Sequence, residues 1–197
     1  MTENSAIIVV DMIYDFIDGS LACRNADGAI KKTDAFIAKA TGNAEGLDSD
    51  AISGSVPVIF IRDHHPENHC SFTEFGGIWP VHCVAGTRGG EIHCDLLKYV
   101  KEELVFDKGC DPRQEQYSGF ESKNAAGQHM SEILELLDVT DCYICGIATE
   151  YCVRNTAEDL LKAGFKVHVL KDCLAYVDAA GHEEALSAMK AKNISIE

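Results

Sequence analysis

Long hydrophobic runs are missing from this sequence of 197 residues, and its first ten residues, MTENSAIIVV, lack the basic start of a secretion signal. No run reaches the roughly 20 apolar residues that a membrane-spanning helix needs. Basic residues are scarce, with 17 Lys and Arg against 32 Asp and Glu, and the net charge is -15. This charge argues against nucleic acid and anionic membranes as partners. We therefore expect a cytoplasmic protein with an acidic, solvated surface.

Two nucleotide-binding signatures are also absent. No glycine-rich turn follows the first apolar run, so the Rossmann fingerprint is missing, and there is no Walker A sequence. Cysteine is plentiful, with nine residues, and without a secretion signal we expect reduced thiols instead of a disulfide framework. Cys142 and Cys145 form a C-x-x-C pair inside an apolar run. Because strand residues three apart point to opposite faces, we expect two buried cysteines there and no zinc or redox pair.

What the sequence does contain is an alternation of apolar runs with helical patterns. Its length, 46% hydrophobic content and 25% charged content fit a single domain over residues 1–197. The alternation predicts an α/β fold, a three-layer α/β/α arrangement with a central, mostly parallel, doubly wound sheet. Strands are expected at 6–10, 56–61, 104–106, 142–145, 167–170 and 194–196. Helices are expected at 27–40, 91–101, 125–137, 150–163 and 179–190, and loops at 41–55, 67–90 and 111–122.

The most informative stretch is CGIATEYCVRNTAED, residues 145–159, in which an apolar run ends in a small turn and a helix follows. Cys152 is expected about three residues inside this helix, with Thr149 as the N-cap. Free N–H groups and the helix dipole would lower the pKa of the thiol and hold an oxyanion. An arbitrary cysteine is usually a small buried hydrophobe, so the assignment of Cys152 as a nucleophile depends on its partners.

Those partners are predicted by the topology. Sites in parallel sheets lie beyond the carboxyl ends of the strands, and Asp11, Lys108 and the 146–152 turn each follow a predicted strand. A thiolate at Cys152 would attack an acyl carbon, a carboxylate would move the thiol proton to the leaving amine, and a lysine would stabilise the anions. The backbone N–H groups of Ala148 and Cys152 are expected to face the oxyanion.

A second cluster lies in the segments DHHPENHC and WPVHC. Asp63 and His65 share a face of an extended backbone, and His82 comes from the loop that follows. Imidazoles with one carboxylate are good ligands for zinc, and also for iron or manganese. A single loop histidine is usually an ordinary polar group, but the whole set favours one divalent metal ion, zinc first. His69 and Glu74 are less certain candidate ligands.

Five separated motifs together resemble the nicotinamidase (pyrazinamidase) branch of the isochorismatase-like cysteine hydrolases, in matching order over nearly the whole chain. They are VVDMIYDF, DHHPENHCSF, WPVHCVAGTRG, DKG with YSGF, and CGIATEYCV. The resemblance implies Asp11 as acid and base, Lys108 as electrostatic support and Cys152 as nucleophile. The implied reaction is hydrolysis of nicotinamide to nicotinate and ammonia through a thioester, with pyrazinamide as a further substrate.

The same resemblance implies metal ligands at Asp63, His65 and His82, with His69 used in some members. In the family the metal orients the substrate through its pyridine nitrogen, which is a templating role. The stretch from residue 108 to 117 is longer than in short bacterial members, which would reshape the mouth of the pocket.

Substrate contacts are implied as well. Phe16 and Trp79 would sandwich the ring, with Tyr117 close by and Ala148 at the reacting end. On their own, these aromatic residues would be assigned to ordinary packing. The resemblance also implies a cis peptide bond between Ile147 and Ala148, which is costly for a non-proline residue.

Two other functions stay open at this point. The same catalytic groups in this family also cleave carbamoyl or ureido compounds, but those relatives generally lack the D-x-H metal segment. The second open function is that of a non-catalytic metal- or ligand-binding protein on the same fold. The presence of Asp11, Lys108 and Cys152 argues against it. The expected partner is a small-molecule substrate, nicotinamide, and a homo-oligomer is left open.

Overall fold

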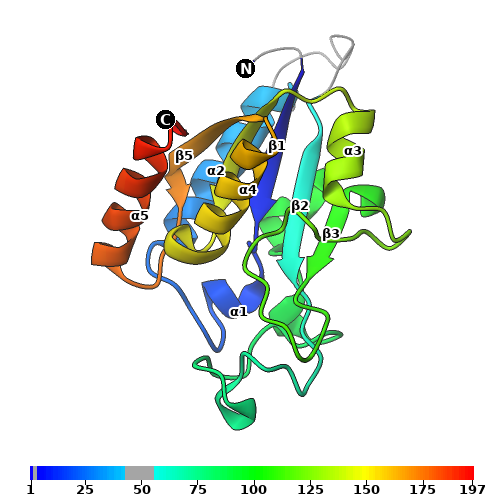
Figure 1. Cartoon of the computed structure of the whole chain (residues 1–197), viewed down its shortest axis with the longest axis vertical. Helices are drawn as coiled ribbons and strands as arrows, with labels where there is room; N and C mark the ends of the chain where they lie inside the picture. The colour runs from blue at the N-terminus through cyan, green and yellow to red at the C-terminus, as the bar shows by residue number, and fades with distance from the viewer. Residues whose placement is uncertain (2–3, 43–55) are drawn as a thin grey trace.

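A parallel β-sheet forms the centre of the computed structural model, which describes residues 1, 4–42 and 56–197 (Figure 1). Its strand order is β3-β2-β1-β4-β5-β6, and the pairings are parallel. The strands are β1 Ser5–Val10, β2 Val58–Asp63, β3 Val105–Lys108, β4 Asp141–Gly146, β5 Lys166–Leu174 and β6 Ser195–Ile196. The predicted parallel, doubly wound α/β fold is confirmed. Most of the predicted 41–55 loop lies outside the described residues.

Strand β1 shows why these segments become central strands. Its sequence, SAIIVV, is buried along its whole length. Ala6, Ile8 and Val10 belong to one hydrophobic cluster, whereas Ile7 and Val9 belong to the cluster on the other face. A strand covered on both faces needs a continuous apolar run, and its β-branched residues suit the pleated backbone.

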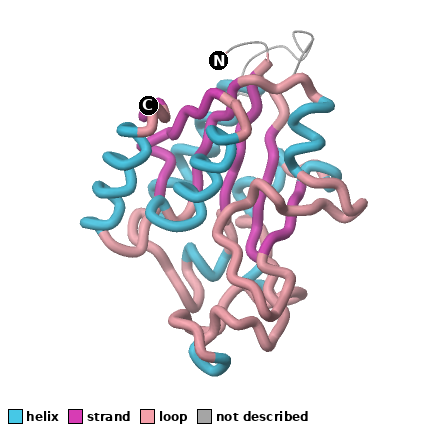
Figure 2. Tube along the Cα trace, in the orientation of Figure 1, coloured by secondary structure: helices cyan, strands magenta, loops and turns pink. Residues whose placement is uncertain are grey.

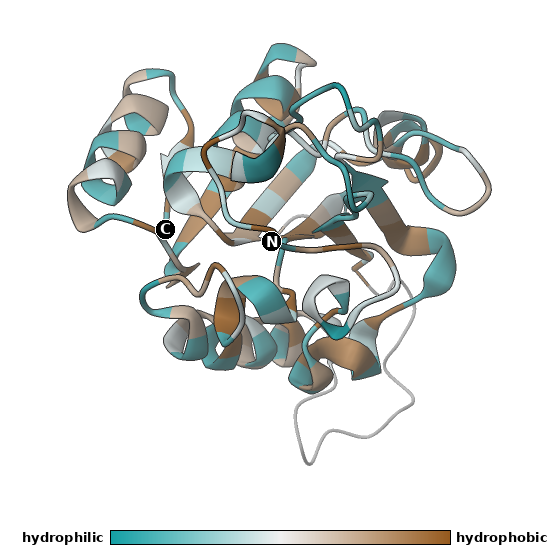
Figure 3. Cartoon of the chain, turned by 90° about the horizontal axis from the view of Figure 1, so that it is seen from below, coloured by the Kyte–Doolittle hydropathy of each residue, from teal (hydrophilic) through white to brown (hydrophobic). Residues whose placement is uncertain are grey.

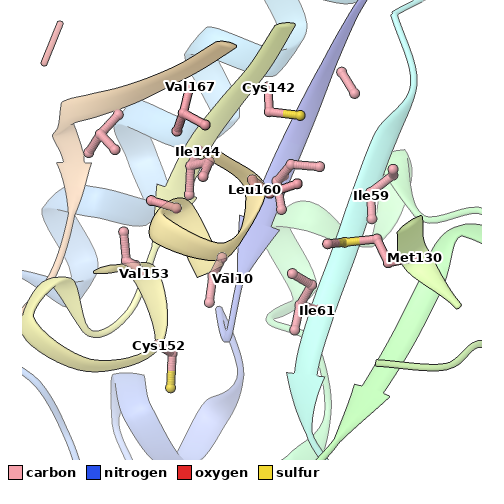
Figure 4. Close-up of a cluster of buried hydrophobic side chains, with 14 of the residues drawn as sticks. Val10, Ile59, Ile61, Met130, Cys142, Ile144, Cys152, Val153, Leu160 and Val167 are labelled. Atoms are coloured by element: carbon pink, nitrogen blue, oxygen red, sulfur yellow. The ribbon is translucent and has the colours of Figure 1, made fainter. Parts of the chain in front are cut away.

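Helices cover both faces of this sheet and make three layers (Figure 3). One face packs against α3 Met130–Leu136, α4 Arg154–Lys162 and α5 Ala179–Ala191. The other packs against α1 Tyr14–Ile17, α2 Ala26–Thr41 and the 3₁₀ turn Cys94–Tyr99. Figure 4 shows the first cluster, with Cys152 at its lower end near the carboxyl ends of the strands. None of the described helices is long and apolar enough to cross a membrane.

The sheet has a topological switch point between β1 and β4. From β1 the chain builds outward to β2 and β3 on one side, and β4, β5 and β6 extend the other side. Val10 at the end of β1 pairs with Gly146 at the end of β4, and Asp63 pairs with Lys108 on β2 and β3. Long loops gather below these strand ends (Figure 2). A crevice at such a point is the usual ligand site of open parallel sheets.

The prediction of a helix over residues 91–101 is wrong. That region forms only the 3₁₀ turn Cys94–Tyr99, in which Val100 N–H bonds to the carbonyl of Leu97 three residues earlier. Leu97 is 53% exposed, so the segment lacks the continuous apolar stripe that would hold a longer helix against the core.

The helix predicted over 125–137 begins later, at Met130. The side chain of Asn124 accepts the N–H groups of Ala126 and Gln128 and folds residues 124–128 into a turn. His129 then caps the helix, and its own N–H donates to Glu132 in a capping box. Local side-chain hydrogen bonds thus replace the first helical turns that the apolar spacing suggested.

Candidate active site

The three predicted catalytic side chains meet below the switch point. Lys108 Nζ lies 2.9 Å from Asp11 Oδ2 and 3.4 Å from Cys152 Sγ. Lys108 also donates to Asp63 Oδ1. Asp11, Lys108 and Cys152 are all buried, so their charges interact with little screening by water. The structure therefore brings the predicted nucleophile, acid and cation into direct contact.

Asp11 owes its position to the backbone just after β1. Its φ of 50° lies in the left-handed region, which aspartate tolerates better than most residues. The N–H of Asp11 donates to the Ile61 carbonyl, and its Oδ1 accepts the Asp63 N–H at 2.9 Å. The carboxyl group is thereby bound to the end of β2, with its second oxygen free to meet Lys108.

Burial dominates the electrostatics of this cluster. It raises the pKa of Asp11 to about 6, although Lys108 acts in the opposite direction. Burial also raises the pKa of the Cys152 thiol, and Lys108 offsets only part of that effect. The expectation of a lowered thiol pKa at a helix N-terminus is therefore wrong for the free site. A protonated sulfur lies beside a carboxyl group that can accept its proton.

The turn that carries Cys152 differs from the predicted helix start. Residues Thr149–Val153 form a π-turn, in which Val153 N–H bonds to the Ala148 carbonyl, and α4 begins only at Arg154. Thr149 is not the N-cap that the sequence suggested. Its hydroxyl donates to the Ala175 carbonyl at 3.0 Å, away from the helix.

The peptide bond between Ile147 and Ala148 is cis, as the resemblance implied. The N–H groups on either side of Ala148 are occupied, Ile147 bonding to Val10 and Thr149 to Ala175. In the part of the chain that the structure describes, the Ala148 N–H has no such acceptor. Ala148 and Cys152 line the same pocket, and a free N–H in such a pocket is what an oxyanion hole requires.

Asp63, His65 and His82 form the second predicted cluster, and their candidate ligand atoms all lie within 4.8 Å of one another. Nδ1 of His65 lies 2.9 Å from the Gly109 carbonyl, and Nδ1 of His82 lies 2.8 Å from the Pro80 carbonyl. Because a carbonyl oxygen only accepts, each ring directs an Nδ1–H at its carbonyl partner, which leaves its Nε2 facing the cluster. Metal-binding histidines are usually oriented in this way.

The charges of this donor set also fit a metal ion. Burial alone raises the pKa of Asp63, but Lys108 and His65 outweigh it and hold that pKa below its ordinary value, so the carboxylate is ionised. Burial lowers the pKa of His82, which favours the neutral ring that a metal requires. Burial also acts to lower the pKa of His65, but the Asp63 carboxylate, 3.5 Å from its Nε2, outweighs burial and raises that pKa, so a metal would have to displace the Nε2 proton of His65. Two imidazoles and one carboxylate match the ligand sets of catalytic zinc sites.

The less certain candidate ligands lie outside this cluster. His69 stacks on His65 with ring centroids 4.0 Å apart. Its Nε2–H donates to the Gln114 carbonyl, and its Nδ1 is 2.7 Å from the Ser71 hydroxyl, so both nitrogens are occupied. Glu74 is exposed on a 3₁₀ turn.

One pocket connects the two clusters. Its wall includes the four predicted substrate-binding residues Phe16, Trp79, Tyr117 and Ala148. It also includes Asp63, His82 and Cys152 from the two clusters. The remaining lining residues, Leu21, Cys23, Glu115, Tyr151 and Val177, were missed by the sequence analysis. They come mostly from irregular segments, where no periodic pattern indicates which side chains point inward.

Aromatic contacts stiffen this pocket. The Trp79 Nε1–H donates to the Tyr117 hydroxyl at 3.2 Å. The Trp79 and Tyr151 rings pack edge to face, with centroids 5.1 Å apart. A larger hollow of about 430 Å³ lies beside β3 and contains none of the predicted site residues. The pocket at the strand ends is therefore the site that combines shape with reactive groups.

Comparison with known proteins agrees with this geometry. Residues 5–197 match the Isochorismatase domain family. The chain is 32% identical over 195 residues to the nicotinamidase/pyrazinamidase of Mycobacterium tuberculosis, with 97% of each chain covered. A pyrazinamidase of Pyrococcus horikoshii in complex with zinc superposes with a TM-score of 0.84, at 39% identity and 98% coverage of each chain.

A third relative is the yeast nicotinamidase bound to the inhibitor nicotinaldehyde. It has a TM-score of 0.80 at 27% identity, with 98% of each chain covered. Together with the domain match over nearly the full length, these relatives confirm the resemblance seen in the five motifs. The chain belongs to the isochorismatase domain family.

Proposed function

We propose that this chain is a metal-dependent nicotinamidase, which hydrolyses nicotinamide to nicotinate and ammonia and also accepts pyrazinamide. The observation that carries the proposal is the contact of Cys152 with Lys108, and of Lys108 with Asp11, in a pocket that also reaches the Asp63, His65 and His82 cluster. The relatives named nicotinamidase and pyrazinamidase support the same substrate class.

Each catalytic residue has one role in the proposed reaction. Asp11 takes the proton of the Cys152 thiol as the sulfur attacks the carboxamide carbon. The negative charge on the former carbonyl oxygen is held by the N–H groups of Ala148 and Cys152. Asp11 then gives its proton to the amide nitrogen, the carbon–nitrogen bond breaks, and ammonia leaves a thioester on Cys152. Asp11 next accepts a proton from water as the water oxygen attacks the thioester carbon, and it returns this proton to the Cys152 sulfur as the carbon–sulfur bond breaks. The acid that is released ionises to nicotinate.

Lys108 has an electrostatic role. Its ammonium group lies between Asp11 and Asp63, and 3.4 Å from the sulfur. It therefore stabilises negative charge at each step, whether that charge is on the sulfur or on a carboxylate. The effect is strong because the group is buried and does not need to reorganise during the reaction.

Asp63, His65 and His82 would hold one divalent ion, zinc first, and the structure of a pyrazinamidase relative in complex with zinc supports this choice of metal. When bound, the ion supplies a Lewis-acid contact that orients the pyridine nitrogen of the substrate. Phe16 and Trp79 would pack against the faces of the ring, and Tyr117 would hold Trp79 in place through their hydrogen bond.

The test is ammonia release from nicotinamide by purified protein, with metal content measured on the same sample. We expect release with about one metal per chain, as for a single catalytic site. No release from a metal-loaded sample with reduced Cys152 would contradict the proposal. Carbamoyl and ureido compounds would then be screened, and the absence of turnover with all of them would favour a binding protein.

A further inference from the structure

We propose that His182 is a positioning residue that holds the oxyanion hole in place through the Thr149 hydroxyl. The inference concerns the site of the proposed function and rests on it. His182 lies in the first turns of α5, far from Cys152 in sequence and outside the substrate pocket. Helix α5 lies beside β5 at one end of the sheet (Figure 1).

The contact is buried and short. Nδ1 of His182 lies 2.9 Å from Oγ1 of Thr149. Thr149 is fully buried, and His182 is only 8% exposed. A buried hydrogen bond between side chains of distant segments restricts both partners, because neither group has water as an alternative partner.

The direction of this hydrogen bond follows from a second hydrogen bond that the Thr149 hydroxyl makes. The Thr149 hydroxyl lies 3.0 Å from the Ala175 carbonyl, which can only accept. The hydroxyl proton is therefore used in that bond, and a lone pair of Oγ1 accepts a hydrogen bond from the Nδ1–H group of His182. The Thr149 backbone N–H donates to the same Ala175 carbonyl at 2.9 Å. Thr149 is thus held through both its backbone and its side chain.

Displacement of Thr149 would move the proposed oxyanion hole. This residue directly follows Ala148, whose N–H has no acceptor among the described residues, and it starts the π-turn that contains Cys152. The N–H of Ala175 in turn donates to the Gly146 carbonyl at 3.1 Å, on the other side of the cis bond. The N–H of Ala148 therefore lies between two points that are fixed to the 175–182 segment, and Cys152 follows in the turn that begins at the second of them.

The next residue, Glu150, strengthens this attachment. Its Oε1 accepts the N–H groups of Val177 at 2.9 Å and Asp178 at 2.8 Å, just before α5. These bonds would survive replacement of His182. Loss of the imidazole would therefore leave the segment attached and the Thr149 hydroxyl bonded to Ala175, but it would remove the second hydrogen bond that fixes Oγ1. The expected result is a small shift in position and not a loss of the fold.

The surroundings of His182 favour correct folding of its variants. One face of the ring packs on Tyr176, with centroids 4.5 Å apart, and the ring also lines a surface hollow of about 360 Å³. Helix α5 is anchored in the core by Ala185, Leu186 and Met189. A leucine at position 182 therefore has room and leaves those anchors unchanged.

Four variants separate positioning from structure. His182→Leu and Thr149→Val remove one partner each, His182→Asn retains an N–H donor near the Nδ1 position, and the double variant removes both. We expect kcat to fall about 10- to 100-fold in the two single variants, with KM little changed, because small misplacements of catalytic groups have effects of this size. His182→Asn should recover most of the activity, and the double variant should be no slower than Thr149→Val.

A second measurement reports on the oxyanion hole itself. The Cys152 sulfur adds to the carbonyl carbon of nicotinaldehyde, the thiol proton passes to Asp11, and the aldehyde oxygen becomes an anion held where the amide oxygen would be. We expect the inhibition constant of nicotinaldehyde to rise by the same factor by which kcat falls. The dissociation constant of nicotinate, the metal content and the melting temperature should stay at wild-type values.

Unchanged kcat in His182→Leu would overturn the inference, and so would parallel losses of metal, nicotinate affinity and melting temperature. If wild-type protein releases no ammonia, the proposed function fails instead. The binding of nicotinaldehyde, followed without turnover, then decides the role of His182 alone: equal affinity in wild type and His182→Leu would overturn it.

Discussion

Lys108 Nζ lies 3.4 Å from the sulfur of Cys152, and both side chains are buried. Burial by itself would lower the pKa of Lys108, but the carboxylates of Asp11 and Asp63 outweigh it and raise that pKa well above its ordinary value. The nucleophile therefore lies beside a permanent positive charge. Two carboxylates hold that charge in place. Asp11 is one of the three predicted catalytic residues, and Asp63 belongs to the candidate metal cluster.

Replacing Lys108 with methionine should destabilise the protein strongly. Two buried carboxylates would then face each other without a cation, and removal of one partner from a buried ion network typically costs about 3–5 kcal/mol. We expect the free energy of unfolding, measured in urea, to fall by about that amount, and turnover to be lost. Lys98→Met is the control, because Lys98 forms an exposed pair with Asp34. Equal unfolding midpoints for the two variants would contradict this account of Lys108.

Replacing Cys152 with alanine should abolish turnover and preserve binding. Removal of a covalent nucleophile lowers kcat by roughly 10⁴-fold or more, whereas the pocket wall and the metal cluster do not depend on the sulfur. Ammonia release, nicotinate affinity and metal content would be measured on the same preparation. Cys94→Ala serves as the control, since Cys94 is exposed and outside the pocket. Substantial activity in Cys152→Ala would rule out the thioester.

Histidine variants test which rings bind the metal. His82→Ala should lose most of its metal and raise the KM for nicotinamide, because the Nε2 atom of His82 is one of the three donors. His69→Ala should retain its metal, since both nitrogens of His69 are already hydrogen-bonded. Metal content after dialysis, measured by elemental analysis, distinguishes the two. Metal loss in both variants would mean that His69 rotates to join the ligand set.

The positions of the reactive groups could be predicted because topology alone determines them. Asp11 follows β1, Lys108 ends β3, and parallel strands bring their carboxyl ends to one edge. Cys142 and Cys145 also lie on opposite faces of β4, as their spacing requires, since they belong to the two different core clusters. In each of these cases a local pattern was sufficient.

What the sequence did not predict depends on contacts between distant segments. The raised pKa of Cys152 follows from its burial, which overrides the helix-terminus effect that its local sequence suggested. Thr149 reads as an N-cap, but Ala175 and His182 take its hydroxyl. Glu115 enters the pocket from a loop with no periodicity. A single sequence contains no signal for such contacts until the fold brings the partners together.

Asp141, at the start of β4, should make the free energy of unfolding depend on pH. The Thr140 hydroxyl donates to it at 2.7 Å and His168 lies 3.3 Å away, and these contacts hold the pKa of Asp141 below its ordinary value of 3.8 although burial acts in the opposite direction. A carboxylate with a lowered folded-state pKa stabilises the protein above its unfolded-state pKa. That contribution is lost as the pH falls through the folded-state value.

Asp141→Asn should therefore lower the free energy of unfolding at neutral pH, whereas at about pH 2 it should differ little from wild type. Urea denaturation over a series of pH values measures this difference. Thr140→Val provides a matched variant, because it removes the hydroxyl that is the main cause of the lowered pKa and leaves the carboxyl group in place. It should show a smaller loss with the same pH dependence. A loss that is constant from neutral pH to pH 2 would indicate a packing effect and not the ionisation of Asp141.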